Sequence, residues 1–154
     1  NFSSDLEIKL IGEVSEEVKK NISDYKLEKT TQYISYVPHN KVMEYQRSTQ
    51  ILLLAVNNVP SAKGIITGKI FEYLQAKRPI LAIAPTGGDL AEIIKNTNSG
   101  KVVGFDEKDL LKKYIFDLYQ KYKNGSLEIE SKNIEKYKRK NLTRQLSEVI
   151  KSLK

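Results

Sequence analysis

The chain has 154 residues, no cysteine and a formal net charge of +7, and hydrophobic residues make up 40% of it. This length and composition predict one soluble globular domain, and the lack of cysteine excludes disulfides, a thiol nucleophile and cysteine-based metal sites. No apolar run approaches the roughly 20 residues that a membrane-spanning helix needs. The chain begins at Asn1 with neither Met nor a signal-like segment, so we expect part of a longer protein, and the lack of cysteine suits a cytoplasmic one.

Short strands alternate with amphipathic helices along the chain. This order predicts an α/β fold, a doubly wound, Rossmann-like parallel sheet with helices on both faces, and the strand at 50–56 is apolar enough to be central in it. Such sheets bind ligands beyond the carboxyl ends of their strands, which selects three loops, 37–40, 57–68 and 85–89. Strands are predicted at 6–11, 32–37, 50–56, 80–84 and 100–103. Helices are predicted from Ser15, at 40–46 with His39 or Asn40 as cap, at 67–76, at 90–96, at 107–123 with Asp106 as cap, and in two terminal segments.

The stretch GIITGKIFEYLQA, residues 64–76, carries the most informative polar side chains. On a helix, Gly68, Lys69 and Glu72 share one face at spacings of three and four. Gly68 in the first turn would let an anion approach backbone N–H groups, and Lys69 would add positive charge beside it. Glu72, one turn deeper, offers two acceptor oxygens for the paired hydroxyls of a ribose. The alternative is a plain amphipathic helix with a solvated lysine and a solvated glutamate.

Two other turns fall at the same edge of the predicted sheet. In PTGGD, Gly87 and Gly88 can wrap backbone donors around phosphate or sugar oxygens, or can simply form a tight turn in which Asp89 caps the next helix. Backbone groups at 36–39 can pair with a base. His39 is the only histidine, so a pair of histidine ligands is excluded, and this residue is either a cap or a surface residue. The chain has no GxxxxGK[ST], GxGxxG or GxSxG motif and no carboxylate cluster suited to Mg²⁺.

Four segments cover nearly the whole chain in a recognisable order: LEIKLIGEV, YISYVPHNKVMEYQRSTQILLLAV, GKIFEYLQAKRPILAIAPTGGDLAEIIKNTNSGKVV and KYKRKNLTRQLSEVIKSL. Together they resemble the C-terminal, nucleotide-sugar-binding half of GT-B-fold glycosyltransferases, in the glycosyl transferases group 1 family. Ser35 stands where that family commonly has glycine. The last segment resembles the terminal helix that packs across the junction between the two domains of such enzymes.

The resemblance implies roles for six residues. Glu72 would bind the ribose of the donor, Val37 would lie near its base, and Gly68 and Lys69 would lie near its diphosphate. The turn at Gly87 and Gly88 would also face the donor. The resemblance implies no metal or other cofactor, because the nucleotide sugar is a substrate, and it assigns no catalytic residue.

The chain also departs from the family pattern in three places. The first of two family glutamates falls at Gly64 and is therefore missing. The family's basic pair for the diphosphate lies on an earlier segment, so we expect residues 1–154 to form one donor-binding domain that lacks its first strand or strands. An N-terminal acceptor domain, absent from this chain, is the expected partner in cis.

The leading hypothesis is the donor-binding part of a hexosyltransferase that uses a UDP-sugar in polysaccharide or glycoconjugate synthesis and is inactive as this fragment alone. One alternative is half of a nucleotide-sugar epimerase with the same fold. The other is a non-enzymatic Rossmann-like module that binds a partner or a polyanion through its basic terminal helices. The basic excess after Asp106 indicates either a solvated face or a peripheral membrane contact, and nucleic acid is not an expected partner.

Overall fold

The computed structural model describes residues 1–153. The chain divides into two compact units, Asn1–Tyr45 and Gln46–Lys154. All strand pairs are parallel and alternate with helices, which confirms the predicted Rossmann-like α/β class. The prediction that residues 1–154 form a single domain stays a prediction.

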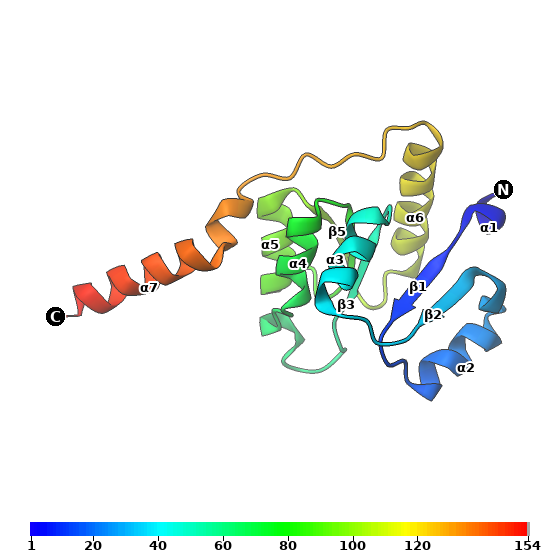
Figure 1. Ribbon diagram of the computed structural model, residues 1–154, viewed down its shortest axis with the longest axis horizontal. Coiled ribbons are helices and arrows are strands. Elements are labelled where there is room, and N and C mark those ends of the chain that lie inside the picture. The colour runs from blue at the N-terminus through cyan, green and yellow to red at the C-terminus, as the bar shows by residue number, and fades with distance from the viewer. Residues whose placement is uncertain (154) are drawn as a thin grey trace. The chain divides into compact units, whose positions relative to one another are not determined.

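The strands of residues 1–153 form two sheets, with β1 paired to β2 in the first unit and the order β3-β4-β5 in the second. Figure 1 shows both groups.

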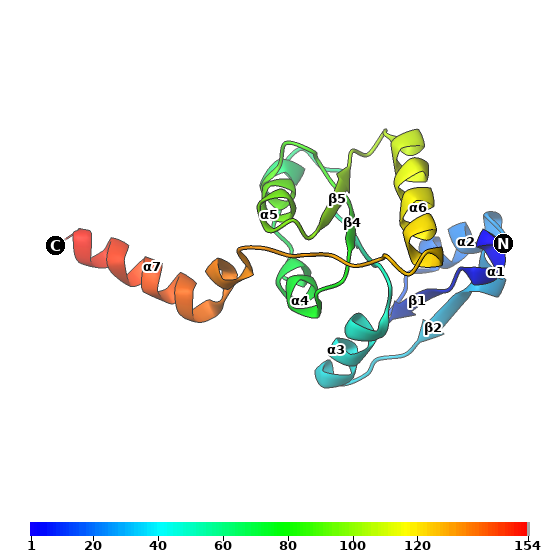
Figure 2. The same cartoon turned by 90° about the horizontal axis from the view of Figure 1, so that it is seen from above.

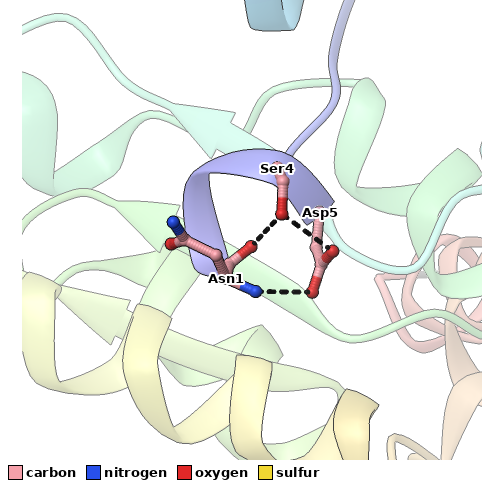
Figure 3. Close-up of polar contacts among 3 residues, drawn as sticks. All are labelled: Asn1, Ser4 and Asp5. Carbon is pink, nitrogen blue, oxygen red and sulfur yellow. Dashed lines mark hydrogen bonds and ion pairs between the residues drawn. The ribbon is translucent and has the colours of Figure 1, made fainter.

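The first unit starts with a single helical turn that local polar contacts close. The hydroxyl of Ser4 donates to the Asn1 carbonyl at 2.7 Å, and the Asn1 amino group lies 3.8 Å from the Asp5 carboxylate (Figure 3). All three residues are exposed, so this turn is a surface feature. The elements of the unit are α1 (Phe2–Asp5), β1 (Ile8–Ile11), α2 (Glu16–Asp24), η1 (Glu28–Thr30), β2 (Thr31–Ile34) and most of α3 (His39–Ser48).

The ladder between β1 and β2 is shorter than predicted. It runs from Ile8 opposite Thr31 to Ile11 opposite Ile34. Gly12 donates one more hydrogen bond to the Ile34 carbonyl at 2.9 Å, but its φ of +102° turns the chain out of the strand. The residues after Ile34 therefore have no β1 residue beside them, and β2 ends three residues before the predicted boundary.

The second unit is a three-stranded sheet with helices on both faces. In Figures 1 and 2, α4 and α5 lie on one side of this sheet and α6 lies on the other. The largest fully buried side chains include Ile70 and Leu74 of α4 and Ile94 of α5, so the helix–sheet interface forms the core. The elements are β3 (Leu52–Ala55), η2 (Ala62–Gly64), α4 (Lys69–Ala76), β4 (Ile80–Ile83), α5 (Asp89–Thr97), β5 (Gly100–Val103), α6 (Lys108–Lys123), η3 (Ile134–Tyr137) and α7 (Arg139–Ser152).

β3 lies at the edge of its sheet although its sequence predicts a central strand. Its side chains are apolar on both faces: Leu52 and Leu54 are buried, whereas Leu53 is 56% exposed. The prediction of a central position was therefore wrong for the strands described here. Packing against α4 explains why Leu52 and Leu54 are apolar, but it does not explain the apolar residue Leu53 on the opposite face.

The three predictions of helix caps were wrong, whereas the helix start predicted near Ser15 is confirmed. Ser15 caps α2, and its hydroxyl oxygen accepts from the Val18 N–H at 3.4 Å. Neither His39 nor Asn40 caps α3, because the helix already includes both and the Pro38 carbonyl accepts its first N–H groups.

The two other cap predictions fail because a neighbouring residue takes the position. Asp106 does not cap α6: Glu107 precedes the helix, and its carboxylate accepts from the Gly104 N–H at 2.6 Å. Asp89 is the first residue of α5 rather than its cap, and the N-cap, Gly88, offers no side chain.

Candidate functional site

Glu72 lies on α4, one turn from the start of the helix, and is half-buried. Its carboxylate oxygen Oε2 accepts a hydrogen bond from the Nε2 amide of Gln46 at 2.9 Å. Gln46 comes from α3 and is only 8% exposed. The carboxylate is therefore held by a buried partner on another helix, unlike the solvated glutamate of a plain amphipathic helix.

The end of α3 that carries Gln46 is fixed by a second contact. The Nε atom of Arg78 donates to the Arg47 carbonyl at 2.7 Å. This carbonyl lies in the last turn of α3, where carbonyl groups lack partners within the helix. Within the second unit, the last turn of α3 is therefore bound to α4 through Glu72 and, through Arg78, to the segment that follows the end of α4 at Ala76.

The neighbouring residue Tyr73 joins the same helix to the sheet. Its hydroxyl donates to the Leu53 carbonyl at 3.3 Å. Burial raises the pKa of the Tyr73 phenol above its usual 10.0, and the negative charge of Glu72 adds to this rise. The side chains of Glu72 and Tyr73 thus connect α4 to α3 on one side and to β3 on the other.

The start of α4 is partly closed by the chain itself. α4 begins at Lys69, two residues later than predicted, because Thr67 satisfies the first donors: its hydroxyl accepts from the Lys69 N–H and its carbonyl from the Ile70 N–H, both at 3.1 Å. Gly68, predicted in the first turn, is instead the N-cap, and a methyl group added to it would meet no atom within 4 Å. Gly68 and Lys69 are exposed, so an anion can still approach this end of the helix.

The two glycines of the turn before α5 differ in their surroundings. A Cβ atom on Gly88 would lie 2.8 Å from the Lys63 carbonyl oxygen, whereas one on Gly87 would meet no atom within 4 Å. Gly88 therefore has a packing role, since it lets the loop after β3 and the turn after β4 touch. Gly87 is exposed, and the prediction that it faces a ligand applies best to this residue.

The first unit has an open hollow of about 620 Å³ at the carboxyl ends of β1 and β2. It lies beside Tyr36, which is 85% exposed, and Val37, predicted to lie near a base, follows directly and is half-buried. The loop after β1 lines part of this hollow and was not among the three predicted loops, although it also follows the carboxyl end of a strand. The lining residues are Gly12, Glu13, Val14, Lys19, Tyr33, Ile34, Ser35 and Tyr36.

The predicted site residues thus belong to both units. Val37 lies in the first unit, whereas Gly68, Lys69, Glu72 and Gly87 lie in the second. The structure brings the loops of the second unit together through the packing of Gly88. The key partner that sequence reasoning missed is Gln46, because a glutamine on an amphipathic helix gives no signal of burial.

Residues 1–153 contain no group of three His, Asp or Glu side chains placed to hold a metal ion. Within the same residues, each helix is either too short or too polar to cross a membrane.

The parallel strands and their crossover helices define a Rossmann-like α/β protein with polar groups beyond the carboxyl ends of its strands. The family model for glycosyl transferases group 1 matches residues 3–141, which is most of the chain. The chain therefore belongs to the glycosyl transferases group 1 family, whose activity is glycosyl transfer. A comparison with curated proteins finds no match.

Proposed function

We propose that this chain binds the nucleoside diphosphate part of a nucleotide-sugar donor, with Glu72 accepting hydrogen bonds from the ribose hydroxyls. The observation that carries the proposal is the carboxylate of Glu72, which is held by Gln46 one turn behind an accessible helix start. Hydroxyl groups form short, strong hydrogen bonds with an ionised carboxylate. Lys69 and the positive end of the helix dipole would attract the diphosphate.

In the proposed reaction, the bond between the sugar C1 atom and the diphosphate oxygen breaks. The acceptor hydroxyl oxygen bonds to C1 and releases its proton, and the nucleoside diphosphate leaves with the bonding electrons. Lys69 and the Gly68 end of α4 would stabilise the negative charge that develops on the leaving group. The proposal assigns no catalytic residue and includes no metal ion or other cofactor.

We also propose that transfer requires an acceptor-binding domain and that this chain alone is inactive. α7 supports this proposal, because no residue of the helix is buried and its apolar side chains recur at helical spacing on one face. The exposed residues of that face are Leu142, Leu146, Val149 and Ile150, and the exposed Leu153 follows the helix directly.

The donor and the setting follow from the family resemblance. We propose a UDP-sugar as donor of a hexosyl group, and polysaccharide or glycoconjugate synthesis in the cytoplasm as the process. A peripheral contact with an anionic membrane, through basic residues near the C-terminal end of the chain, is part of the same proposal.

The test is a calorimetric titration of the chain with UDP, GDP and ADP, repeated with Glu72→Ala. Loss of hydrogen bonds to a charged group costs about 1.5–3 kcal/mol, so the substitution should weaken binding roughly ten- to hundredfold. Glu92→Ala, which removes an exposed glutamate from α5, is the matched control and should bind as the parent chain does. Equal affinities of the parent chain and Glu72→Ala, or no binding of any of the three nucleotides, would contradict the proposal.

A further inference from the structure

We infer that Gln46 is a positioning residue of the donor site, which orients the Glu72 carboxylate for the ribose. This inference deepens the proposed function and rests on it. The two residues are 26 positions apart in the sequence and come from different helices, so their contact is a product of the fold. Gln46 touches the carboxylate rather than the donor, and it would act through Glu72.

The burial of Gln46 makes the loss of its hydrogen bond energetically costly. A buried amide that loses its hydrogen-bond partner is costly, because water cannot replace that partner. Thr97 and Ser99, the other buried polar side chains of residues 1–153, satisfy each other at 2.8 Å. Gln46 instead donates to a carboxylate that is itself only half-buried. A buried donor therefore holds an acceptor that remains accessible from outside.

The contact leaves acceptor capacity on Glu72 for a ligand. An ionised carboxylate has two oxygens and about four lone-pair sites. Gln46 uses one site on Oε2, which leaves Oε1 and the second site of Oε2 for the hydroxyl groups of a ribose. A free glutamate side chain loses rotational freedom when a ligand fixes it, whereas Glu72 is already restrained before the ligand arrives.

The backbone under Gln46 is restrained as well. The adjacent Arg47 carbonyl accepts from Arg78, so the last turn of α3 cannot easily move away from α4. Gln46 thus connects a fixed helix end to Glu72, the residue predicted to bind the ribose. A substitution of Gln46 should change the orientation of the Glu72 carboxylate, whereas the proposed contacts of Lys69 and Gly68 with the diphosphate should stay in place.

The experiment compares the affinity for a ribonucleoside diphosphate with the affinity for its 2′-deoxy counterpart. The probe is whichever of UDP, GDP and ADP binds the parent chain most tightly. The ratio of the two affinities reports on recognition of the ribose hydroxyl and cancels effects on the diphosphate. A purely structural role of Gln46 would weaken both ligands alike and leave this ratio unchanged.

Gln46→Leu removes the donor at similar volume, and it should lower the ratio severalfold towards the value of Glu72→Ala. Gln75→Leu, the same change at an exposed position on α4, should keep the parent ratio. The double variant Gln46→Leu with Glu72→Ala should have the same affinity ratio as Glu72→Ala alone, because both changes act on one carboxylate. Gln46→Met, which also lacks a donor, serves if Gln46→Leu does not fold.

The outcomes separate this inference from the proposed function. If Gln46→Leu keeps the affinity ratio of the parent chain while the ratio of Glu72→Ala falls to about one, the role of Gln46 is overturned and the ribose role of Glu72 stands. A parent ratio in Glu72→Ala would overturn both. A reduced ratio in both variants supports both.

Discussion

The adjacent glycines Gly87 and Gly88 allow a direct test of the packing described at the turn before α5. An alanine methyl at position 88 would lie 2.8 Å from the Lys63 carbonyl oxygen and 3.1 Å from its Cα atom. Both are backbone atoms, which cannot rotate out of the way, and overpacking of this kind costs about 1–3 kcal/mol. At position 87 the methyl has open space, and replacing an unstrained glycine with alanine gains about 0.4–1 kcal/mol from the unfolded state.

The two variants should therefore differ in free energy of unfolding by about 1.5–4 kcal/mol, with Gly88→Ala the less stable. Urea unfolding followed by circular dichroism measures this difference. With a slope of about 1–3 kcal/mol/M, the midpoint of Gly88→Ala should lie on the order of 1 M below that of Gly87→Ala. Gly87→Ala should in turn weaken nucleoside diphosphate binding without a loss of stability. Equal urea midpoints for the two variants would refute the packing role of Gly88.

Three further predictions concern stability. The raised pKa of Tyr73 means that the folded chain holds the phenol proton to higher pH than the unfolded chain, so this contribution is complete below about pH 10 and is lost above it, by up to about 1.4 kcal/mol per pH unit. Tyr73→Phe should remove that part of the alkaline loss, and urea midpoints at several alkaline pH values would show it; an unchanged slope counts against it. Leu54→Ala, at a 2% exposed position, should cost about 2–5 kcal/mol, whereas Leu53→Ala at the exposed position beside it should cost far less; similar losses in a urea titration would be inconsistent with the observed burial. Ser15→Ala should cost about 1 kcal/mol through loss of the cap to the Val18 N–H, and no change in the thermal midpoint would argue against that cap.

The sequence was sufficient for features that depend on nearby residues. The strand and helix order, the start of α2 near Ser15 and the place of Glu72 on α4 all follow from local pattern and spacing. The boundaries of strands and helices were predicted less accurately, because contacts with other residues determine them. β2 ends where Gly12 leaves the ladder, and α4 starts after Thr67, which accepts from the first N–H groups.

Features that depend on distant residues could not be predicted. Gly87 and Gly88 are identical in sequence terms, and only the backbone of Lys63 makes them different. A glutamine on an amphipathic helix is usually solvated, so nothing local indicated that Gln46 is buried against Glu72. The sequence therefore places Lys69 and Glu72 on the predicted helix, whereas the residues that support them could not be predicted.

The edge position of β3 bears on how the chain behaves at high concentration. Natural sheets usually protect an outer strand with lysine, proline or a bulge, whereas the sequence of β3 is LLLA and offers none of these. The Tyr73 hydroxyl already occupies the Leu53 carbonyl, and the other backbone groups on the outer edge of this strand can pair with the backbone of another molecule. We expect purified samples to self-associate as concentration rises. Leu53→Lys, at the exposed position, should keep them monodisperse in light scattering. Equal association of the parent and variant chains would show that another surface mediates it.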